Sequence, residues 1–416
     1  MASGSSAEAT AIVTRSIVSS RFERAARLVV ESRDLLDARP REEEPPESIA
    51  SRGWAEFLLG IDDAELAALE MGGLDATWPD HAPSSLVTLA AEARAVCDVG
   101  SLDAEPVVKT SLRRLETPRK RAQIDAFARV VAPLATRASR IVDVGSGHGH
   151  LTRDLAERFA LPVVGLERDD ALAGRARSLS AGASPSFAVT DVLRDGLSLS
   201  GDDCVVGLHA CGELGDAMVA GAARSGASIA LVGCCMQKRR GASWRPLRAP
   251  GQAVAPGDAL ELPKRLLGLS NLTACDDGVE TNRAANLAGR ERRLALYRLL
   301  SARDPALRPG AEIEGLNRRA AQGDLASLVR RAFALRGLEA PSSAAIDEAA
   351  GWARVHHPRL RRLSVPRMML ARTLEVLILC DRARYLEDRD FSVAVGALFP
   401  PDVSPRNLAL VAARVA

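Results

Sequence analysis

The chain has 416 residues, of which 47% are hydrophobic and 26% charged, enough for two or three domains that each bury a core. This composition excludes a chain that is disordered throughout. The 55 basic and 53 acidic residues leave a formal charge of +2, which argues against a protein whose whole surface coats nucleic acid. No apolar run is long enough to span a membrane, and residues 1–16 lack the features of a secretory signal. We therefore expect a soluble cytoplasmic protein with no membrane partner.

The cysteine and aromatic content further limits the classes of protein to which the chain can belong. Seven cysteines without a repeated spacing are expected to be reduced thiols in a chain of this length. Aromatic residues make up only 3% of the chain, so no platform for stacking single-stranded bases is expected.

Residues 1–105 are expected to form a helical N-terminal domain. Apolar residues between Arg15 and Leu36 recur at intervals of three and four, which predicts an amphipathic helix. Prolines and glutamates interrupt this pattern over 39–47. Further helices are predicted over Trp54 to Met71 and over Ser84 to Cys97.

Residues 106–237 are expected to hold the first part of a Rossmann-like α/β core. Short apolar segments alternate with helical patterns, which predicts a parallel, doubly wound sheet. The predicted strands are Ile141 to Val144, Val163 to Leu166, Phe187 to Val189, Val205 to Leu208 and Ile229 to Val232.

The rest of the chain is expected to form an insertion followed by the last elements of the core. Residues 238–365 predict a basic loop and a helical insertion without strands, and residues 366–416 predict the closing helix and β-hairpin of the core. The predicted helices of the insertion are Ala284 to Leu300, Leu325 to Leu335 and Ala344 to His356. The closing elements are a helix over Arg367 to Leu386 and strands over Phe391 to Leu398 and Asn407 to Val411.

Three glycines, Gly145, Gly147 and Gly149, follow the first predicted strand directly. Glycine lets the backbone approach a ligand, and the N-terminus of the next helix offers unpaired N–H groups. Dinucleotide sites favour G-x-G-x-x-G/A, whereas here the third glycine comes one residue earlier and His150 follows it. S-adenosylmethionine carries no phosphate and is often bound at a D-x-G-x-G-x-G turn, which begins here at Asp143. A tight glycine turn without a ligand is the alternative.

Residues at other strand ends extend the predicted cofactor site. Glu167 ends the second strand, where a carboxylate can accept hydrogen bonds from both ribose hydroxyls of a nucleoside. Asp191 follows the third strand and could accept from an adenine amino group, whereas Asp143 could orient the methionine end. Leu208, at the end of the fourth strand, is also assigned to this site. The alternative for Asp191 and Glu167 is a solvated or helix-capping acid.

His209, Cys211, Cys234 and Cys235 are expected to converge, because carboxyl ends of neighbouring parallel strands meet at one edge of the sheet. A histidine and three thiols suit zinc, but this spacing is not the usual C-x₂₋₄-C, so no metal is predicted. A nucleophilic cysteine is disfavoured because nothing in the spacing supplies its base. Small thiols packed at strand ends are the preferred interpretation for Cys234 and Cys235.

His209 is the candidate catalytic residue. Imidazole can accept a proton near neutral pH at the mouth of the crevice. Alternatively, its ring holds the loop by a hydrogen bond to the backbone. Methyl transfer from a sulfonium needs a base only for some nucleophiles.

Basic residues gather in three clusters, over Arg113 to Arg121, Lys238 to Arg248 and Arg354 to Arg372. The middle cluster follows the fifth strand at the ligand edge, so it could meet phosphates or an acidic substrate. Solvated charge is the preferred interpretation, because the chain uses arginine throughout.

Together these motifs resemble the methyltransferase-like proteins of eukaryotes and bacteria, some of them called ribosomal RNA adenine dimethylase domain-containing proteins. The resemblance spans most of the chain, and the Leu-His-x-Cys-Gly and Gly-Cys-Cys pair is its most specific part. Its stretches are Thr117-Pro-Arg-Lys120, Val142 to Leu151, Gly207-Leu-His-Ala-Cys-Gly-Glu-Leu214, Val232-Gly-Cys-Cys235, Leu379-Cys-Asp-Arg382, Tyr385-Leu-Glu387, Phe399 and Ser404 to Ala412.

The resemblance implies a class I methyltransferase fold that uses S-adenosylmethionine, with Gly145, Gly147, Gly149 and Glu167 at the cofactor. The chain departs from the family at Met236-Gln237, where the family carries an aromatic residue, and at Arg119 to Gln123. The Asn/Asp-Pro-Pro-Tyr/Phe motif of adenine amino methylation is absent after the fourth strand.

Two other functions stay open beside the methyltransferase. One is a non-catalytic adaptor of the same fold that binds RNA or ribosomal protein, and the other, disfavoured by His150, is a dinucleotide oxidoreductase. The methyl acceptor is not identified by the sequence, with RNA or protein slightly favoured over a small molecule. The oligomeric state is not predicted.

Overall fold

The computed structural model describes residues 4–38, 44–102, 117–180, 184–247, 256–272, 280–316 and 318–415. The chain divides into two compact units. The sheet unit comprises Met1–Asp37, Thr88–Ala274 and Met368–Ala416, and the helical unit comprises Ala38–Val87 and Cys275–Arg367.

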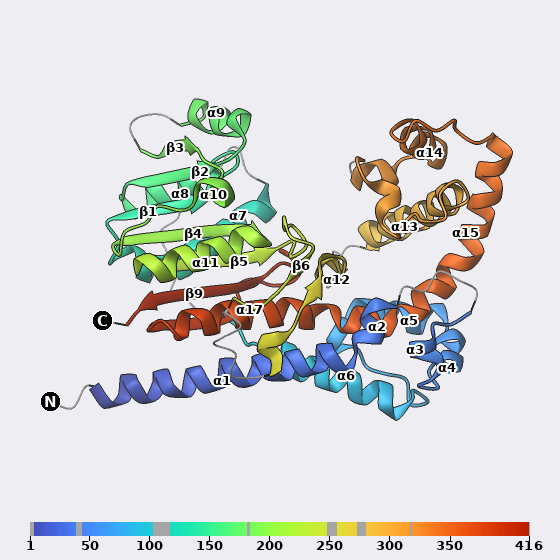
Figure 1. Cartoon of the computed structure of the whole chain (residues 1–416), viewed down its shortest axis with the longest axis horizontal. Coiled ribbons are helices and arrows are strands. Elements are labelled where there is room, and N and C mark those ends of the chain that lie inside the picture. Colours follow the sequence, from blue (N-terminus) through green and yellow to red (C-terminus); the bar gives the residue numbers. More distant parts are fainter. Residues whose placement is uncertain are drawn as a thin grey trace. The chain divides into compact units, whose positions relative to one another are not determined.

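A seven-stranded sheet in the order β3-β2-β1-β4-β5-β9-β8 forms the centre of the sheet unit (Figure 1). Strands β1 to β5 run parallel, and β9 pairs antiparallel with both β5 and β8. The strands are β1 (Arg140–Val144), β2 (Val163–Glu167), β3 (Ser186–Val189), β4 (Asp203–Cys211), β5 (Ser228–Cys234), β8 (Phe391–Ala397) and β9 (Leu408–Arg414). The expected Rossmann-like α/β sheet, closed by a C-terminal hairpin, is confirmed.

One expectation about strands was wrong. No strand was predicted between Cys235 and the closing helix, yet β6 (Ser243–Trp244) pairs antiparallel with β7 (Leu262–Pro263). Two residues per strand are too few to show the alternation by which a strand is recognised.

Helices make up most of the remaining described chain. In chain order they are α1 (Gly4–Glu31), α2 (Arg33–Asp37), α3 (Glu47–Ala50), α4 (Ala55–Gly60), α5 (Asp63–Gly72), α6 (Ser84–Cys97), α7 (Pro118–Ala135), α8 (His150–Phe159), α9 (Asp170–Ser178), α10 (Val192–Asp195), α11 (Glu213–Ser225), α12 (Lys264–Leu267), α13 (Glu280–Ser301), α14 (Leu325–Ala334), α15 (Ser343–Leu363), α16 (Val365–Met369) and α17 (Ala371–Glu387).

Helices cover both faces of the sheet. On one face, Phe127 and Val131 of α7 share a buried cluster with Val206 of β4. The next residue of β4 faces the other way, because a Cβ at Gly207 would lie 2.7 Å from the methyl carbon of Met218 in α11. The apolar run of β4 is therefore buried on both sides, as parallel strands require.

Helix α1 belongs to the sheet unit, because it lies alongside α17 (Figure 1). Phe22, Ala25 and Val29 of α1 are fully buried. This grouping differs from the expected N-terminal domain of residues 1–105, because the apolar face of α1 packs in the sheet unit whereas residues 38–87 belong to the helical unit. The other expected domain limits stay predictions.

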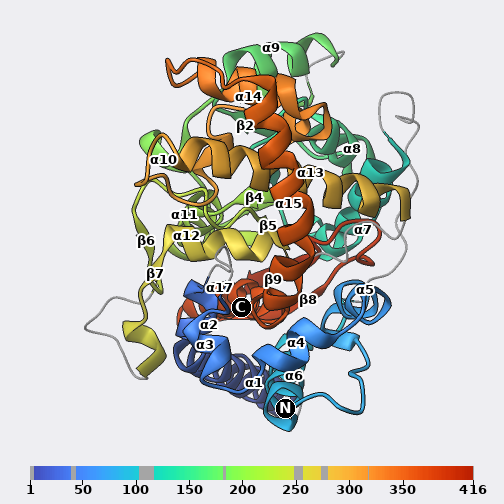
Figure 2. The same cartoon turned by 90° about the vertical axis from the view of Figure 1, so that its right-hand side faces the viewer.

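The helical unit joins two distant segments of the chain. Helices α13 and α15 pack side by side (Figure 2), over a core that includes Leu296, Leu328 and Phe333. The single helix expected over Trp54 to Met71 is two helices, because Asp62 forms a capping box with Glu65 that starts α5 anew. Within the described residues, no helix has both the length and the apolar character that crossing a bilayer requires.

Candidate functional site

The turn between β1 and α8 is built on left-handed glycines. Gly145, Gly147 and Gly149 have φ angles of 76°, 55° and 73°, which side chains other than glycine rarely adopt. A Cβ at Gly149 would lie 2.5 Å from the ring of Phe187, so the backbone there is closely packed. A Cβ at Gly147 would have no atom within 4 Å. The turn is therefore packed behind Gly149 and open at Gly147.

Glu167 faces this turn from the end of β2. Its Oε2 accepts a hydrogen bond from the backbone N–H of Gly147 at 3.0 Å, and its Oε1 accepts one from Asp169 N–H at 3.0 Å. The register of β1 and β2, in which Val144 pairs with Leu166, makes the two strand ends neighbours. Each carboxylate oxygen has a further lone pair that can accept from a ligand.

Asp143 lies inside the strand rather than at the surface. It is 2% exposed, and Thr152 Oγ1 in the first turn of α8 donates to its Oδ2 at 2.7 Å. Burial raises the pKa of Asp143 to about 6. Asp143 thus fixes the start of α8 against β1, and its contact with the methionine end of a cofactor stays a prediction.

Asp191 and Leu208 have structural partners of their own. Asp191 is the N-cap of α10, where its Oδ1 accepts from Leu193 N–H at 3.1 Å, and its Oδ2 lies 3.1 Å from Arg240 Nη2. The helix-capping alternative is therefore present. Leu208 is half-buried and packs on the core below the sheet edge. Their contacts with a cofactor stay predictions.

His209 occupies an irregularity in β4. The pairing register between β4 and β5 shifts between Leu208 and Ala210, and His209 has a φ of 72°. A left-handed conformation costs a non-glycine residue about 1–2 kcal/mol, so surrounding contacts must hold it. Such strained positions concentrate at functional sites.

The imidazole of His209 is held by a side chain from α7. Its Nε2 lies 3.1 Å from Gln123 Oε1, and Gln123 Nε2 donates to the carbonyl of Val403 at 3.3 Å. With the amide oriented this way, Nε2–H is the donor and Nδ1 of the neutral ring carries a lone pair. Burial, together with the charge of Lys120, lowers the pKa of His209 to about 4. The ring is thus neutral at pH 7 and able to accept a proton.

Three thiols converge beside His209. Cys211 pairs with Cys234 in the register of β4 and β5, and their Sγ atoms are 2.8 Å apart. The Sγ atom of Cys235 completes a group in which all sulfur atoms lie within 4.8 Å of one another. Hydrogen bonds from the other two thiols lower the pKa of Cys235. His209 turns its carbonyl oxygen toward this group, 3.1 Å from Cys234 Sγ and 3.5 Å from Cys211 Sγ.

The basic cluster after β5 is largely compensated. Arg239 pairs with Asp216, Arg240 with Asp191, and Arg245 with Glu261. Arg248 and, in the first cluster, Arg113 and Arg114 lie outside the described residues. These ion pairs weaken the interpretation of the middle cluster as a phosphate site, because three of its arginines already have carboxylate partners.

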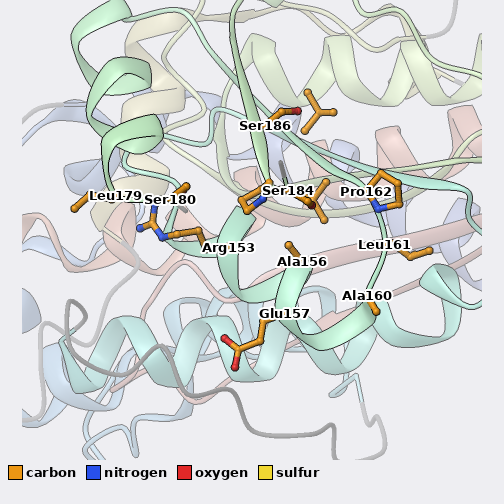
Figure 3. Close-up of a pocket in the computed structure, with 13 residues that line it drawn as sticks. Arg153, Ala156, Glu157, Ala160, Leu161, Pro162, Leu179, Ser180, Ser184 and Ser186 are labelled. Atoms are coloured by element: carbon orange, nitrogen blue, oxygen red, sulfur yellow. The ribbon is translucent and has the colours of Figure 1, made fainter. Parts of the chain in front are cut away.

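A hollow of about 810 Å³ lies elsewhere in the sheet unit (Figure 3). Its lining includes Arg153 and Glu157 of α8, Pro162 before β2, and Ser184 and Ser186 around the start of β3. These are the amino ends of the strands, whereas ligands of open α/β sheets bind at the carboxyl ends. The hollow contains none of the predicted site residues.

Sequence reasoning missed α7 and therefore Gln123. The signal was present, since Thr117 caps the helix by accepting from Lys120 N–H and Pro118 occupies its first turn. It also missed the buried Arg382 of α17, which donates to Asp216 Oδ1 at 2.8 Å and to the carbonyl of Gly212 at 2.8 Å. This arginine ties α17 to the turn that follows β4.

Comparison with known proteins adds a family match to this geometry. Residues 119–241, which contain β1 to β5, match the family model of a methyltransferase domain. This match supports methyl transfer as the activity of the sheet unit.

Two solved structures are similar over part of the chain. The sugar N-methyltransferase KedS8 from Streptoalloteichus sp ATCC 53650 is 18% identical over 37% of this chain and 62% of that chain, with a TM-score of 0.24. A putative protein-L-isoaspartate O-methyltransferase from Plasmodium falciparum, in complex with S-adenosyl-L-homocysteine, is 18% identical over 45% of this chain and 82% of that chain, with a TM-score of 0.23. The similarity thus covers less than two thirds of the length of KedS8.

Proposed function

We propose that this protein is an S-adenosylmethionine-dependent methyltransferase whose cofactor site is the glycine turn after β1 together with Glu167. The observation that carries this proposal is the hydrogen bond from Gly147 N–H to Glu167 Oε2 beside the open side of Gly147. The segment that contains both residues matches a methyltransferase domain.

The residues of the turn suit a nucleoside without phosphates. Gly147 leaves space for a ligand against the backbone, and Glu167 can accept hydrogen bonds from the two ribose hydroxyls. When bound, S-adenosylmethionine supplies an electrophilic methyl group on a sulfonium. Gly145 and Gly149 shape the turn, Asp143 fixes its base through Thr152, and Asp191 and Leu208 are assigned to the adenine side.

His209 is proposed as the proton acceptor. An N–H or O–H nucleophile must lose a proton when it gains a methyl group, and Nδ1 of a neutral imidazole can take that proton. Gln123 is a positioning residue, because its Oε1 fixes the tautomer and the direction of the ring. Burial lowers the pKa of His209 to about 4, which keeps the Nδ1 lone pair available near pH 7 and also makes the ring a weaker base than an exposed histidine.

The methyl acceptor is proposed to be RNA or protein, but not the amino group of adenine. The chain resembles the methyltransferase-like family described above, yet β4 ends in His209-Ala-Cys211-Gly212, where adenine amino methylation normally uses Asn/Asp-Pro-Pro-Tyr/Phe. No aromatic ring follows β4 in this segment to stack on a base.

Calorimetric titration with S-adenosylhomocysteine tests the cofactor site. Wild type is expected to bind, and Gly147→Arg is expected to lose binding because its side chain fills the open side of the turn. Gly337→Arg is the matched control, since Gly337 has a φ of 65° and equally open surroundings in the helical unit. No binding by wild type, or equal binding by Gly147→Arg, would overturn the proposal.

Transfer of a labelled methyl group tests the activity. Extract from cells that lack the protein is incubated with labelled S-adenosylmethionine and purified protein, and RNA, protein and metabolite fractions are separated. Label in the RNA or protein fraction is expected with wild type, and at least tenfold less with His209→Asn. Binding of S-adenosylhomocysteine without any labelled product would instead identify a non-catalytic adaptor.

A further inference from the structure

The three thiols at the ends of β4 and β5 have no role in the proposed cofactor site. Cys234 is 7% exposed, and Cys211 and Cys235 are half-buried, so the group is partly accessible to solvent. Cys204 and Cys380, by contrast, are fully buried. Only Cys211, Cys234 and Cys235 form a group with metal-ligand geometry within the described part of the chain.

The backbone around the thiols is held rigidly. Gly212 has a φ of 50°, and a Cβ there would lie 2.3 Å from the carbonyl oxygen of Lys238. Glu213 N–H donates to the same carbonyl at 3.1 Å, and Lys238 N–H donates to Cys235 C=O at 2.9 Å. The segment after β5 is therefore folded back on the turn after β4, which brings Cys235 to Cys211.

The carbonyl oxygen of His209 adds a further polar atom to the group. This oxygen faces Cys234 and Cys211. It does so where His209 adopts a left-handed conformation and the pairing register of β4 shifts. The thiols of Cys234 and Cys211 donate to this carbonyl, so the group is polar and hydrogen-bonded in the metal-free protein, and these thiols must lose their protons to bind a metal.

We propose that Cys211, Cys234 and Cys235 bind one zinc ion through their three sulfur atoms, with the fourth position open to an exchangeable ligand. Zinc takes thiolate sulfur at about 2.3 Å in tetrahedral geometry, which places the sulfur atoms about 3.8 Å apart. The Sγ atoms of Cys211 and Cys234 are 2.8 Å apart, closer than this value, and all three sulfur atoms lie within 4.8 Å of one another. The pair Cys211 and Cys234 must move apart by about 1 Å to reach this spacing.

Three protein ligands and one open position are the arrangement of catalytic rather than structural zinc. The sequence analysis disfavoured a metal because ligands spaced two apart and then directly adjacent do not have the usual C-x₂₋₄-C spacing. Here the register of two parallel strands, Cys211 opposite Cys234, supplies the proximity that the spacing lacks. The inference is independent of the cofactor site, since it needs neither the glycine turn nor Glu167.

Metal content of the full-length protein tests the site. Protein purified under reducing conditions is incubated with zinc chloride, desalted and analysed by mass spectrometry for zinc. Wild type is expected to hold about one ion per chain, and a variant with all three cysteines changed to serine to hold less than a tenth of that. Cys97→Ser is the matched control, because Cys97 lies beside Thr373, outside the group, and should leave zinc unchanged.

Cobalt provides a second measurement that reports on the ligands themselves. Wild type with Co²⁺ is expected to show sulfur-to-cobalt charge-transfer absorption, which Cys235→Ser should reduce by about a third as one of three sulfur ligands is lost. This single variant keeps the proposal testable if the triple variant does not fold. Gly147→Arg should keep its zinc even where it loses S-adenosylhomocysteine, which separates this proposal from the previous one.

Three outcomes would overturn the zinc site. Wild type that stays free of zinc contradicts it, as does a folded triple variant that retains the ion. The third is a Cys211–Cys234 disulfide in protein purified under reducing conditions, because a stable disulfide removes two of the three ligands. After denaturation and alkylation it would be seen as two cysteines that escape alkylation, located by peptide mapping.

Discussion

His209 shows how one residue can combine a backbone and a side-chain function. Its left-handed conformation directs the carbonyl oxygen to the thiols, while its ring reaches Gln123 on α7. The two functions can be separated, because asparagine tolerates the left-handed region better than other non-glycine residues. His209→Asn is therefore expected to retain the backbone conformation while it removes the titrating ring and its hydrogen bond to Gln123.

This separation predicts a pH-dependent stability difference. The pKa of His209 is about 4 in the folded protein and about 6.5 when unfolded, so the unfolded state binds more protons between these values. Wild type should consequently lose about 2 kcal/mol relative to His209→Asn between pH 7 and pH 4.5. Urea unfolding at both pH values measures it, and the other histidines cancel between the two proteins. An equal loss in both would contradict the assignment of a neutral, buried His209.

The sequence predicts the role of some site residues and not of others. Gly145, Gly147 and Gly149 were identified because a left-handed turn after a strand demands glycine locally. The hydrogen bond between Gln123 and His209 was not, because 86 residues separate the partners and only tertiary packing joins them. Convergence of the thiols was expected from strand topology, whereas their distances required the register.

At the scale of elements, periodic patterns predicted strands β1 to β5, the closing hairpin and most long helices. Two failures have local causes. Helix α7 was missed although Thr117 and Pro118 mark its start, and the break between α4 and α5 was missed although Asp62 and Glu65 have capping-box spacing. In both cases the residues that cap the start of the helix, rather than the spacing of apolar residues, indicate where the helix begins.

Helix α17 is fixed to the sheet edge by one buried arginine. Arg382 is 1% exposed, and its Nε and Nη2 donate to Asp216 Oδ1 on α11 at 2.9 and 2.8 Å. A Cβ on Gly215 would lie 2.7 Å from this guanidinium, so the neighbouring backbone is packed against it. Helix α17 thus contacts the turn at Gly212, which directly follows Cys211 at the end of β4.

Arg382→Met is expected to destabilise the protein by about 1–3 kcal/mol, because the Asp216 carboxylate loses one buried arginine partner and keeps Arg239. The matched control is Arg194→Met, which removes a solvent-exposed pair with Asp195 and should leave the free energy of unfolding nearly unchanged. Urea unfolding measures both. A loss for Arg382→Met no larger than that of the control would show that the ion pair contributes nothing beyond its packing.

At the scale of the whole molecule, each unit is assembled from segments far apart in the chain. The helical unit joins Ala38–Val87 to Cys275–Arg367, and Glu70 on α5 links them by accepting from Arg283 on α13 and Arg361 on α15. The side chain of Glu70 is 8% exposed. No local pattern could indicate this link, because its partners lie more than two hundred residues away.

Glu70→Gln separates the stability of the two units. This substitution removes the charge of a buried acceptor of two arginines and should lower the free energy of unfolding of the helical unit by about 2 kcal/mol. Amide hydrogens of α5, α13 and α15 that exchange through unfolding of this unit should then exchange roughly thirtyfold faster. Asp63→Asn is the matched control, since Asp63 is 81% exposed and pairs with Arg362 at the surface. Exchange in β1 and β4, and the affinity for S-adenosylhomocysteine, should stay at wild-type values, because the glycine turn and Glu167 belong to the sheet unit. Equal loss of protection in both units would show that they unfold as one, and the cofactor site would then depend on the helical unit for its stability.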